Sequence, residues 1–218
     1  MQLISPNVFT EDGRLYTRSS GPKDTYSERI VKRDGSYYRE WDPYRSKIAA
    51  ALMRKLKQLL LEEDSRVLYL GCGSGTTVSH ISDIVKRGIV FAVDISEKEM
   101  RLLSLKTANR TNIAPILADA RDPEGYQKSM ASLHVDVIIQ DVATKDQLDI
   151  LMRNARSYLK SGGDAYLSLK TKSISKTSPP THILDEAKER LRSEFTILKS
   201  VNLRGYEDHH WLLHLRKP

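Results

Sequence analysis

Residues 67–77 read Val-Leu-Tyr-Leu-Gly-Cys-Gly-Ser-Gly-Thr-Thr: an apolar run of strand character, a glycine-rich turn and the start of a helix. Glycines at such a turn let a ligand approach the backbone, which makes Gly71 and Gly73 candidate binding residues. A tight turn without a ligand has the same composition, so the stretch alone leaves binding open. Dinucleotide sites require Gly or Ala where this chain has Thr76. The stretch therefore favours a cofactor without pyrophosphate.

Short apolar segments alternate with amphipathic ones on the C-terminal side of this stretch. The predicted strands are residues 67–70, 90–93, 113–117, 135–139 and 165–169. Their alternation with helices predicts an α/β fold with a parallel sheet covered on both faces. Segments 195–203 and 211–215 are too close in sequence for a crossover helix and are expected to pair antiparallel, which gives seven strands in all.

On the N-terminal side, residues 1–42 form a small β-rich region in which segments 29–33 and 36–41 are joined by an Asp34-Gly35 turn. Asp42-Pro43 is the expected start of a helix that carries Ile48, Leu52, Leu56 and Leu59 on one face. The predicted division is therefore 1–42 and 43–218. The Ser/Thr/Lys/Pro run 172–181 is expected to be an exposed loop.

The composition narrows the function classes. The chain has 218 residues, and 35 Lys+Arg against 28 Asp+Glu give a formal charge of +7, which favours a polyanionic partner without requiring one. Cys72 is the single cysteine, so disulfides and thiolate zinc sites are excluded and a reducing, cytoplasmic location is expected. No secretory leader is recognised and the longest apolar run is residues 48–53, so no membrane association is expected.

Charged side chains follow four of the predicted strands: Asp94, Asp119, Asp141 and Lys170. The carboxyl ends of parallel strands form the binding crevice, so these groups should meet the glycine turn, although an isolated Asp after a strand is often a helix cap. Asp94 could accept both ribose hydroxyls and Asp119 an adenine amine, while Asp141 could face a cation or orient a nucleophile. Ribose, adenine and a cation together describe S-adenosylmethionine.

Two further groups are expected at this crevice. Lys47 falls in the first turn of a predicted helix, where the macrodipole disfavours a cation, although a solvated surface lysine remains an ordinary reading. The short connection before the last strand brings His209 and His210 toward Lys170 and Asp141. Adjacent histidines on a strand point to opposite faces, which disfavours a zinc site, and no metal is predicted.

Taken together, several blocks resemble the fibrillarin family over about residues 14–216. They are Tyr-Arg-Glu-Trp-Asp-Pro-Tyr-Arg-Ser-Lys at 38–47, Val-Leu-Tyr-Leu-Gly at 67–71, Ser-Gly-Thr-Thr-Val-Ser-His at 74–80, Asp-Val-Ala at 141–143, and Tyr206-Glu207 before His210. The resemblance is to the archaeal form, without a Gly/Arg-rich extension. It implies a Rossmann-like class I methyltransferase sheet and an S-adenosylmethionine-dependent enzyme that methylates ribose 2′-hydroxyls of rRNA and tRNA.

The resemblance also implies partners and site residues. The target is chosen by box C/D guide RNA, and the enzyme is held by a Nop-family scaffold protein and a kink-turn-binding, ribosomal-type protein. The implied catalytic residues are Lys47, Asp141, Lys170 and His210. The implied cofactor contacts are Thr76, Thr77, Asp94, Ile95, Asp119, Ala120, Asp141, Val142, Ala143, Thr144 and Gln147.

The chain departs from the family pattern at three places. Residues 71–75 read Gly-Cys-Gly-Ser-Gly where Gly-Ala-Ala-Ser-Gly is usual, Thr144 stands at a usual Gln, and His209 at a usual Asp. None of these removes a proposed catalytic group, and the spacing from Tyr206 favours His210 over His209. The proton acceptor stays open among Asp141, a desolvated Lys170 and His210.

Two other functions remain compatible with parts of the sequence. An unguided class I methyltransferase acting on another substrate would share the glycine turn and Asp94, although block 38–47 argues against it. A non-catalytic RNA-binding subunit fits the positive charge, but it would be expected to have lost Lys47, Asp141 or Lys170. A nicotinamide-dependent dehydrogenase is disfavoured by Thr76.

Overall fold

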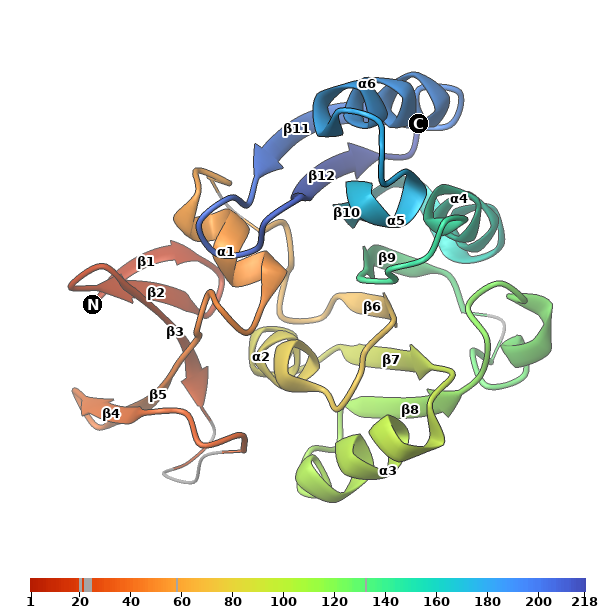
Figure 1. Cartoon of the computed structure of the whole chain (residues 1–218). Helices are drawn as coiled ribbons and strands as arrows, with labels where there is room; N and C mark the ends of the chain where they lie inside the picture. The colour runs from red at the N-terminus through yellow and green to blue at the C-terminus, as the bar shows by residue number, and fades with distance from the viewer. Residues whose placement is uncertain (20, 22–24, 58, 132) are drawn as a thin grey trace.

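The computed structural model of the chain describes residues 1–19, 21, 25–57, 59–131 and 133–218. These residues form a seven-stranded sheet with helices on both faces and a five-stranded sheet that packs beside one of those faces (Figure 1). The predicted fold class is confirmed.

The larger sheet contains the glycine-rich stretch at its centre. Its strands are β6 (Arg66–Leu70), β7 (Ile89–Asp94), β8 (Ile113–Leu117), β9 (Val135–Gln140), β10 (Leu159–Lys170), β11 (Thr196–Asn202) and β12 (His210–Arg216). They lie in the order β11-β12-β10-β9-β6-β7-β8. The strands from β6 to β10 pair in parallel, as predicted. β12 is antiparallel to β11, as predicted, and it is also antiparallel to β10, which was not predicted.

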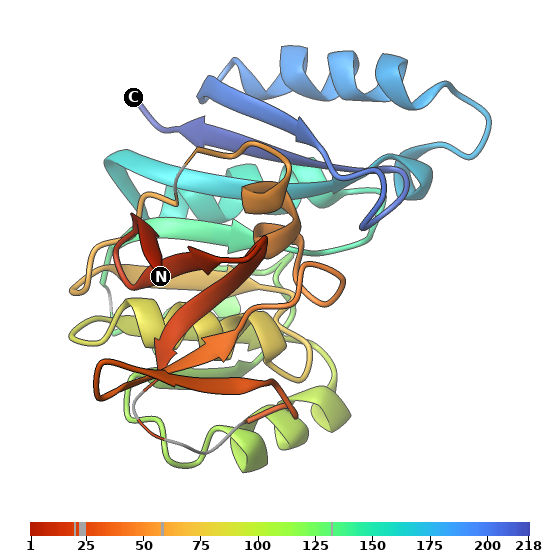
Figure 2. The same cartoon turned by 90° about the vertical axis from the view of Figure 1, so that its left-hand side faces the viewer.

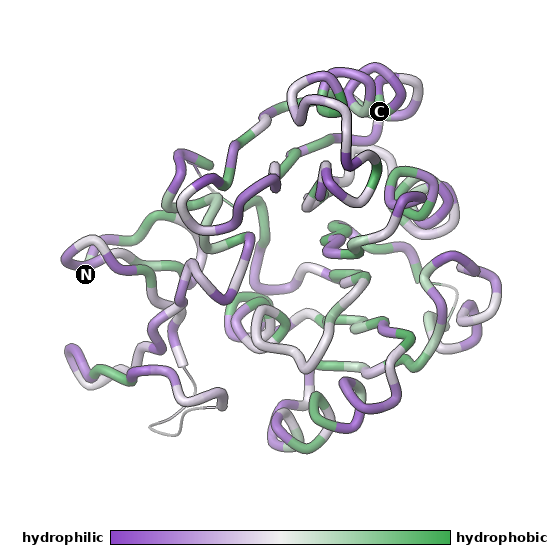
Figure 3. The backbone as a smooth tube through the Cα atoms, in the orientation of Figure 1, coloured by the Kyte–Doolittle hydropathy of each residue, from purple (hydrophilic) through white to green (hydrophobic). Residues whose placement is uncertain are grey.

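Alternating side chains divide the core into two layers. The helical segments are α1 (Lys47–Met53), α2 (Thr76–Ile84), α3 (Glu97–Lys106), the 3-10 turn η1 (Glu124–Tyr126), α4 (Gln147–Tyr158), α5 (Thr171–Ile174) and α6 (Pro180–Leu191). Val67 and Tyr69 pack with α1, α2 and α3. Leu68 and Leu70 point to the other face and pack with η1, α4 and α6. Figure 3 shows hydrophobic residues along the strands and hydrophilic ones on outer helix surfaces.

The N-terminal residues form the smaller, antiparallel sheet. Its strands are β1 (Gln2–Ser5), β2 (Val8–Glu11), β3 (Arg14–Ser19), β4 (Ile30–Arg33) and β5 (Ser36–Glu40), in the order β1-β2-β3-β5-β4. The predicted hairpin turn is present, because Asp34 and Gly35 both have positive φ. Val8, Leu15 and Trp41 belong to the same core cluster as α1 and α2, and Figure 2 shows this sheet lying over those helices.

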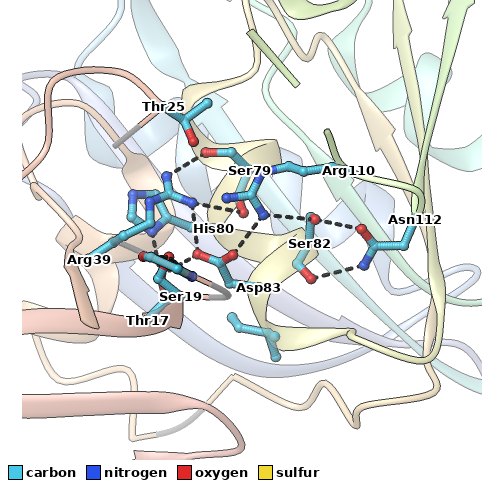
Figure 4. A network of polar contacts seen from close by, with 12 residues as sticks. Thr17, Ser19, Thr25, Arg39, Ser79, His80, Ser82, Asp83, Arg110 and Asn112 are labelled. Carbon is cyan, nitrogen blue, oxygen red and sulfur yellow. Dashed lines mark hydrogen bonds and ion pairs between the residues drawn. The ribbon is translucent and has the colours of Figure 1, made fainter. Parts of the chain in front are cut away.

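Besides these apolar contacts, a buried polar cluster joins the smaller sheet to α2 (Figure 4). The fully buried Arg39 guanidinium contacts Glu28 Oε1 at 2.6 Å, Asp83 Oδ2 at 2.7 Å and Ser79 Oγ at 2.8 Å. On the other side of Asp83, Arg110 contacts Oδ1 at 2.6 Å. We call Glu28, Arg39, Ser79, Asp83 and Arg110 the junction network.

A neutral histidine lies beside the junction network. His80 stacks on Trp41, and its Nδ1 lies 2.7 Å from Thr17 Oγ1. Burial lowers the pKa of His80 well below its usual range, and the Arg39 and Arg110 cations lower it further. The nearby Glu28 carboxylate is therefore neutralised by Arg39 and not by His80.

The sequence-based helix after the smaller sheet was wrong at both ends. Ser46, and not Asp42, caps α1 by accepting the Ala49 N–H, because the Asp42 carboxylate accepts the Tyr44 N–H in the preceding turn. The helix ends at Met53, and Lys55 has a φ of 83°, which a continuing helix does not tolerate. Leu56 and Leu59 are nevertheless buried, in the irregular segment that follows.

The predicted loop at 172–181 is also shorter than expected. Residues 171–174 form α5, and α6 begins at Pro180, which a first helical turn accommodates. Only residues 175–179 are irregular, and the Ser175 hydroxyl accepts the Thr177 and Ser178 N–H groups there. Within the described ranges, every helix falls short of the length and apolar character that a membrane crossing requires.

Candidate active site

The glycine-rich turn bends tightly across the carboxyl ends of β6, β7 and β9. Gly71 has a φ of 74°, and a Cβ there would lie 2.6 Å from the Asp141 carbonyl oxygen. The Gly71 and Cys72 N–H groups both donate to the Val93 carbonyl, at 2.9 and 3.1 Å. Only glycine satisfies both the left-handed φ and the close approach at position 71. The turn is thereby held against the two strands that precede Asp94 and Asp141.

The outer side of the turn is held by the N-terminal region. Gly75 has a φ of 91°, and a Cβ there would overlap a Leu103 methyl group and approach the Tyr26 hydroxyl at 2.8 Å. That hydroxyl donates to the Ser74 carbonyl. Burial raises the pKa of Tyr26, so the phenol keeps its proton for this bond. Tyr26 was not predicted to take part in the site, because it lies 48 residues before the carbonyl that it contacts.

Asp94 both shapes the turn and offers acceptors. Its Oδ2 accepts the Gly73 N–H at 2.8 Å and its Oδ1 accepts the Ser96 N–H at 2.9 Å. Because a carboxylate oxygen has two lone-pair directions, each oxygen can accept one more hydrogen bond. Ile95 beside it is 64% exposed, which leaves an apolar surface next to the carboxylate. Asp94 could therefore bind a ribose diol through its carboxylate, and Ile95 could contact a planar ring attached to that ribose.

Asp119 forms the next wall. Its Oδ1 accepts the Arg121 N–H at 2.9 Å, and the Arg121 side chain bridges Asp119 and Asp146. The carboxylate is partly exposed and can accept an exocyclic amine. A cavity of about 260 Å³ connects these groups. It is lined by Gly71, Gly73, Val93, Asp94, Ile95, Ala118, Asp119, Ala120, Arg121, Asp141, Val142, Ala143, Thr144 and Ile150.

The residues of this cavity fit S-adenosylmethionine. The turn at Gly71 has no room for a Cβ, the Asp94 carboxylate can accept a ribose diol, Ile95 offers an apolar surface, and Asp119 can accept an amine. Ten of the predicted cofactor residues line the cavity. Thr76, Thr77 and Gln147 do not. Val93, Ala118, Arg121 and Ile150 line it without having been predicted; the first three adjoin predicted strand-end residues, whereas Ile150 comes from α4.

The three residues outside the cavity support it from behind. The Thr77 hydroxyl donates to Ser46 Oγ at 3.1 Å, which links α2 to the start of α1. Thr76 begins α2, directly after the turn. Gln147 is fully buried, where its amide nitrogen donates to the Thr144 and Lys170 carbonyls and its oxygen accepts the Lys170 N–H at 2.9 Å. It thereby connects the segment after β9 to the end of β10.

Lys47 contacts Asp141, which lines the cavity. Lys47 Nζ lies 2.8 Å from Asp141 Oδ2, and both side chains keep about a fifth of their surface exposed. Residues 94 positions apart in the chain thus form one ion pair. Asp141 lies there because its N–H donates to the Leu70 carbonyl at the end of β6. The unfavourable placement of Lys47 in the first helical turn is offset by this carboxylate.

His210 and Lys170 approach from β12 and β10. They are direct partners in the antiparallel β10–β12 register, so their side chains leave the sheet on the same face. Burial lowers the pKa of His210, and the neighbouring Lys47 cation lowers it further, against the bond to the Asp208 carbonyl, which raises it. That carbonyl lies 3.0 Å from Nδ1 and can only accept, so Nδ1 carries the proton of the neutral ring. Nε2 is therefore free to accept a proton.

His209 has a different role. It has a φ of 62°, its side chain is exposed, and its carbonyl accepts the Thr171 N–H and hydroxyl at 3.1 and 3.0 Å. Among the two adjacent histidines, His210 is the buried one, in agreement with the spacing from Tyr206.

A second hollow lies at the opposite edge of the sheet. It has a volume of about 560 Å³ and is lined partly by the ion pairs Asp136–Lys160 and Asp164–Arg216. Asp136 and Asp164 are neutralised by these cations, Glu62 and Asp64 also line the hollow, and the glycine-rich turn 71–75 lies outside it. Within the described residues, no group of three or more His, Cys, Asp or Glu side chains is placed to hold a metal ion.

Comparison with known proteins identifies the family of the chain. Residues 5–217 match the family model described as Fibrillarin. The chain is 42% identical over 220 residues to the fibrillarin-like rRNA/tRNA 2′-O-methyltransferase of Thermococcus sibiricus, covering 98% of this chain and 96% of the relative.

Solved structures agree as well. A chain from a fibrillarin/Nop5p complex superposes with a TM-score of 0.92 at 38% identity, covering 100% of both chains. Aeropyrum pernix fibrillarin with natively bound S-adenosyl-L-methionine superposes with a TM-score of 0.84 at 38% identity, covering 93% of this chain and 88% of that one.

Proposed function

Because this chain belongs to the fibrillarin family, we propose that it is an S-adenosylmethionine-dependent RNA 2′-O-methyltransferase acting on rRNA and tRNA. The observation that carries the proposal is the ion pair of Lys47 with Asp141, a residue that lines the same cavity as Gly71, Asp94 and Asp119. A methyl donor held by the cavity would present its reactive end to this pair.

S-adenosylmethionine supplies a methyl group already activated by its sulfonium charge. The chain's own contribution is alignment, which can account for several kcal/mol of the barrier. We assign cofactor binding to Asp94 at the ribose, Asp119 at the adenine amine and the 71–75 turn at the backbone. The Asp141 carboxylate, oriented by Lys47, receives the hydrogen bond of the ribose 2′-hydroxyl and takes its proton during transfer.

The remaining two residues serve this proton transfer. Lys170 faces the same side of the sheet as His210 and supplies a cation for an RNA phosphate. Neutral His210, with Nε2 unprotonated, relays the proton from Asp141 onward. Solvent reaches both members of the Lys47–Asp141 pair, so the proton has a route out.

We further infer that the enzyme works in a ribonucleoprotein. The structurally similar fibrillarin/Nop5p complex supports a Nop-family scaffold as partner. Box C/D guide RNA and a kink-turn-binding protein complete the proposed particle. The chain's charge of +7 is modest for a protein that would have to find RNA targets alone, which fits target selection by base pairing.

A reconstituted assay tests the proposal. Labelled S-adenosylmethionine, the scaffold proteins, a guide RNA and a matched target are combined, and the methylated sugar is mapped. We expect methylation at the guided ribose, its loss in Asp141→Asn, and retention in Asp136→Asn, which alters the aspartate of another Lys–Asp pair at the opposite end of β9. Methylation without guide RNA would support an unguided enzyme. RNA binding without any methyl transfer would support a non-catalytic subunit.

A further inference from the structure

One buried polar residue of the N-terminal region touches the cofactor turn without a role in the chemistry above. Tyr26 is 4% exposed, and its hydroxyl donates to the Ser74 carbonyl in the turn 71–75. A buried phenol requires a partner for its hydroxyl, and here that partner is the backbone next to the cofactor cavity. The Lys106 Nζ lies 4.9 Å from the centre of the Tyr26 ring, which adds a cation–π contact to this bond.

The backbone around Tyr26 is held by a carboxylate. Glu28 Oε2 accepts the Thr25 and Tyr26 N–H groups at 2.9 and 2.8 Å, and Glu28 Oε1 contacts the buried Arg39 guanidinium at 2.6 Å. Ser27, between them, has a φ of 63°, a left-handed conformation that is strained for a residue with a Cβ. Such strain persists only where surrounding contacts impose it, and it is concentrated at functional sites. Segment 25–28 is therefore fixed in one conformation.

The Tyr26 carbonyl leads to the other half of the active site. Arg45 Nη1 donates to it at 2.9 Å, and Arg45 lies two residues before Lys47. One residue of the N-terminal region thus contacts the turn 71–75 through its hydroxyl and the segment that carries Lys47 through its carbonyl. Methyl transfer requires those two parts to be aligned, because reacting atoms that are displaced by about 1 Å can lose about two orders of magnitude in rate.

We propose that Tyr26 is a positioning residue for methyl transfer: its hydroxyl holds the turn 71–75 in the conformation that binds S-adenosylmethionine, and its carbonyl, through Arg45, sets the Lys47 segment against that turn. This inference rests on the proposed function. Without the hydroxyl, the turn also adopts other conformations, and the apparent cofactor affinity falls in proportion to the fraction that remains competent. The worth of one neutral hydrogen bond limits this loss to about tenfold.

The first test isolates the hydroxyl. Tyr26→Phe retains the ring, and calorimetry should show a loss of about 2- to 10-fold in S-adenosylmethionine affinity. In the reconstituted particle, the KM for the cofactor should rise by the same factor, with kcat unchanged at saturating cofactor. Amide exchange of the turn 71–75 should accelerate in the cofactor-free protein. Tyr166→Phe is the control, because the buried Tyr166 hydroxyl accepts the Leu60 N–H at 2.8 Å and Leu60 lines the opposite hollow. It should lower the free energy of unfolding and leave the affinity unchanged.

The second test isolates the carbonyl. Arg45→Met removes its donor but keeps the hydroxyl bond of Tyr26, so the cofactor affinity should stay unchanged while kcat at saturating cofactor and RNA falls about 3- to 30-fold. Arg54→Met is the control at the other end of α1, where Arg54 Nε donates to the Asn202 carbonyl at 3.4 Å, and it should match the unmodified enzyme. A rise in the KM for RNA with kcat unchanged would assign Arg45 to RNA binding and overturn its link to Lys47.

The other failures are distinguishable. An unchanged affinity in Tyr26→Phe, or an equal loss in Tyr166→Phe, overturns the role of the hydroxyl. A kcat of Arg45→Met equal to that of Arg54→Met overturns the role of the carbonyl. Calorimetry needs no RNA, so these results separate from the proposed function. A lowered affinity in Tyr26→Phe, with no methyl transfer by the unmodified particle, supports the hydroxyl and contradicts both the proposed function and the link to Lys47.

Discussion

Replacing Arg39 by Met tests whether the junction network holds the smaller sheet in place. The guanidinium is fully buried and is the shared partner of Glu28 and Asp83, whose side chains are 4% and 2% exposed. Methionine fills a similar volume without charge. Glu28 then keeps the Thr25 and Tyr26 N–H groups, and Asp83 keeps Arg110 and the Thr17 hydroxyl.

The expected cost follows from these remaining partners. Removing one member of a buried ion pair costs about 3–5 kcal/mol, because a buried charge is left uncompensated. Both carboxylates keep some partners here, so we expect the low end, about 3 kcal/mol. For a chain of this size, this corresponds to a decrease in Tm of about 6–12 °C. Urea unfolding followed by circular dichroism gives the free energy directly.

Arg14→Met is the matched control. Arg14 is 51% exposed and pairs with Glu40 at 2.6 Å in the same small sheet, so its loss should cost less than about 1 kcal/mol. Adding Glu28→Gln to Arg39→Met should recover part of the loss, since it removes one uncompensated charge. If Arg39→Met costs no more than Arg14→Met, the junction network does not stabilise the fold.

Three further predictions concern the site and its pH range. Asp94→Ala should weaken S-adenosylmethionine binding by about one to two orders of magnitude, the equivalent of lost charge-assisted hydrogen bonds, and calorimetry showing an unchanged affinity would contradict its assignment. Gly71→Ala should abolish cofactor binding, because its Cβ would meet the Asp141 carbonyl. Gly162 also has a positive φ, of 73°, but lies in open space, so Gly162→Ala should lower the free energy of unfolding only by the backbone cost of about 1–2 kcal/mol. Lowering the pH below about 6.5 should decrease the free energy of unfolding, because His80 then binds a proton in the unfolded chain but not in the native state, where its pKa is lowered. Urea titrations at several pH values should show a weaker pH dependence of this free energy in His80→Gln. An unchanged pH dependence would assign the effect to other groups.

The parts of the site that follow strand ends were predictable from the sequence. Asp94, Asp119 and Asp141 each follow an apolar run, and parallel strands end at one edge, so their convergence required no knowledge of side-chain packing. The observed register brings them to one cavity. The strand β10 likewise continues to Lys170, opposite His210.

What could not be predicted depends on contacts between distant segments. Arg39 sits in a short hairpin strand where an exposed arginine is ordinary, and only the packing of that hairpin on α2 makes it fully buried. Gln147 was expected at the cofactor, but its amide is saturated by backbone groups from two other segments. The end of α1 depended on the left-handed Lys55, for which no local residue type gave a signal.

The position of β12 in the larger sheet affects how the protein is made. This strand lies between β10 and β11, so a strand that follows all the others in the sequence enters the interior of the sheet. Until residues 210–216 have left the ribosome, β10 has an unpaired edge that is open to other chains. A nascent chain interrupted before His210 therefore lacks that histidine and exposes an aggregation-prone edge at β10.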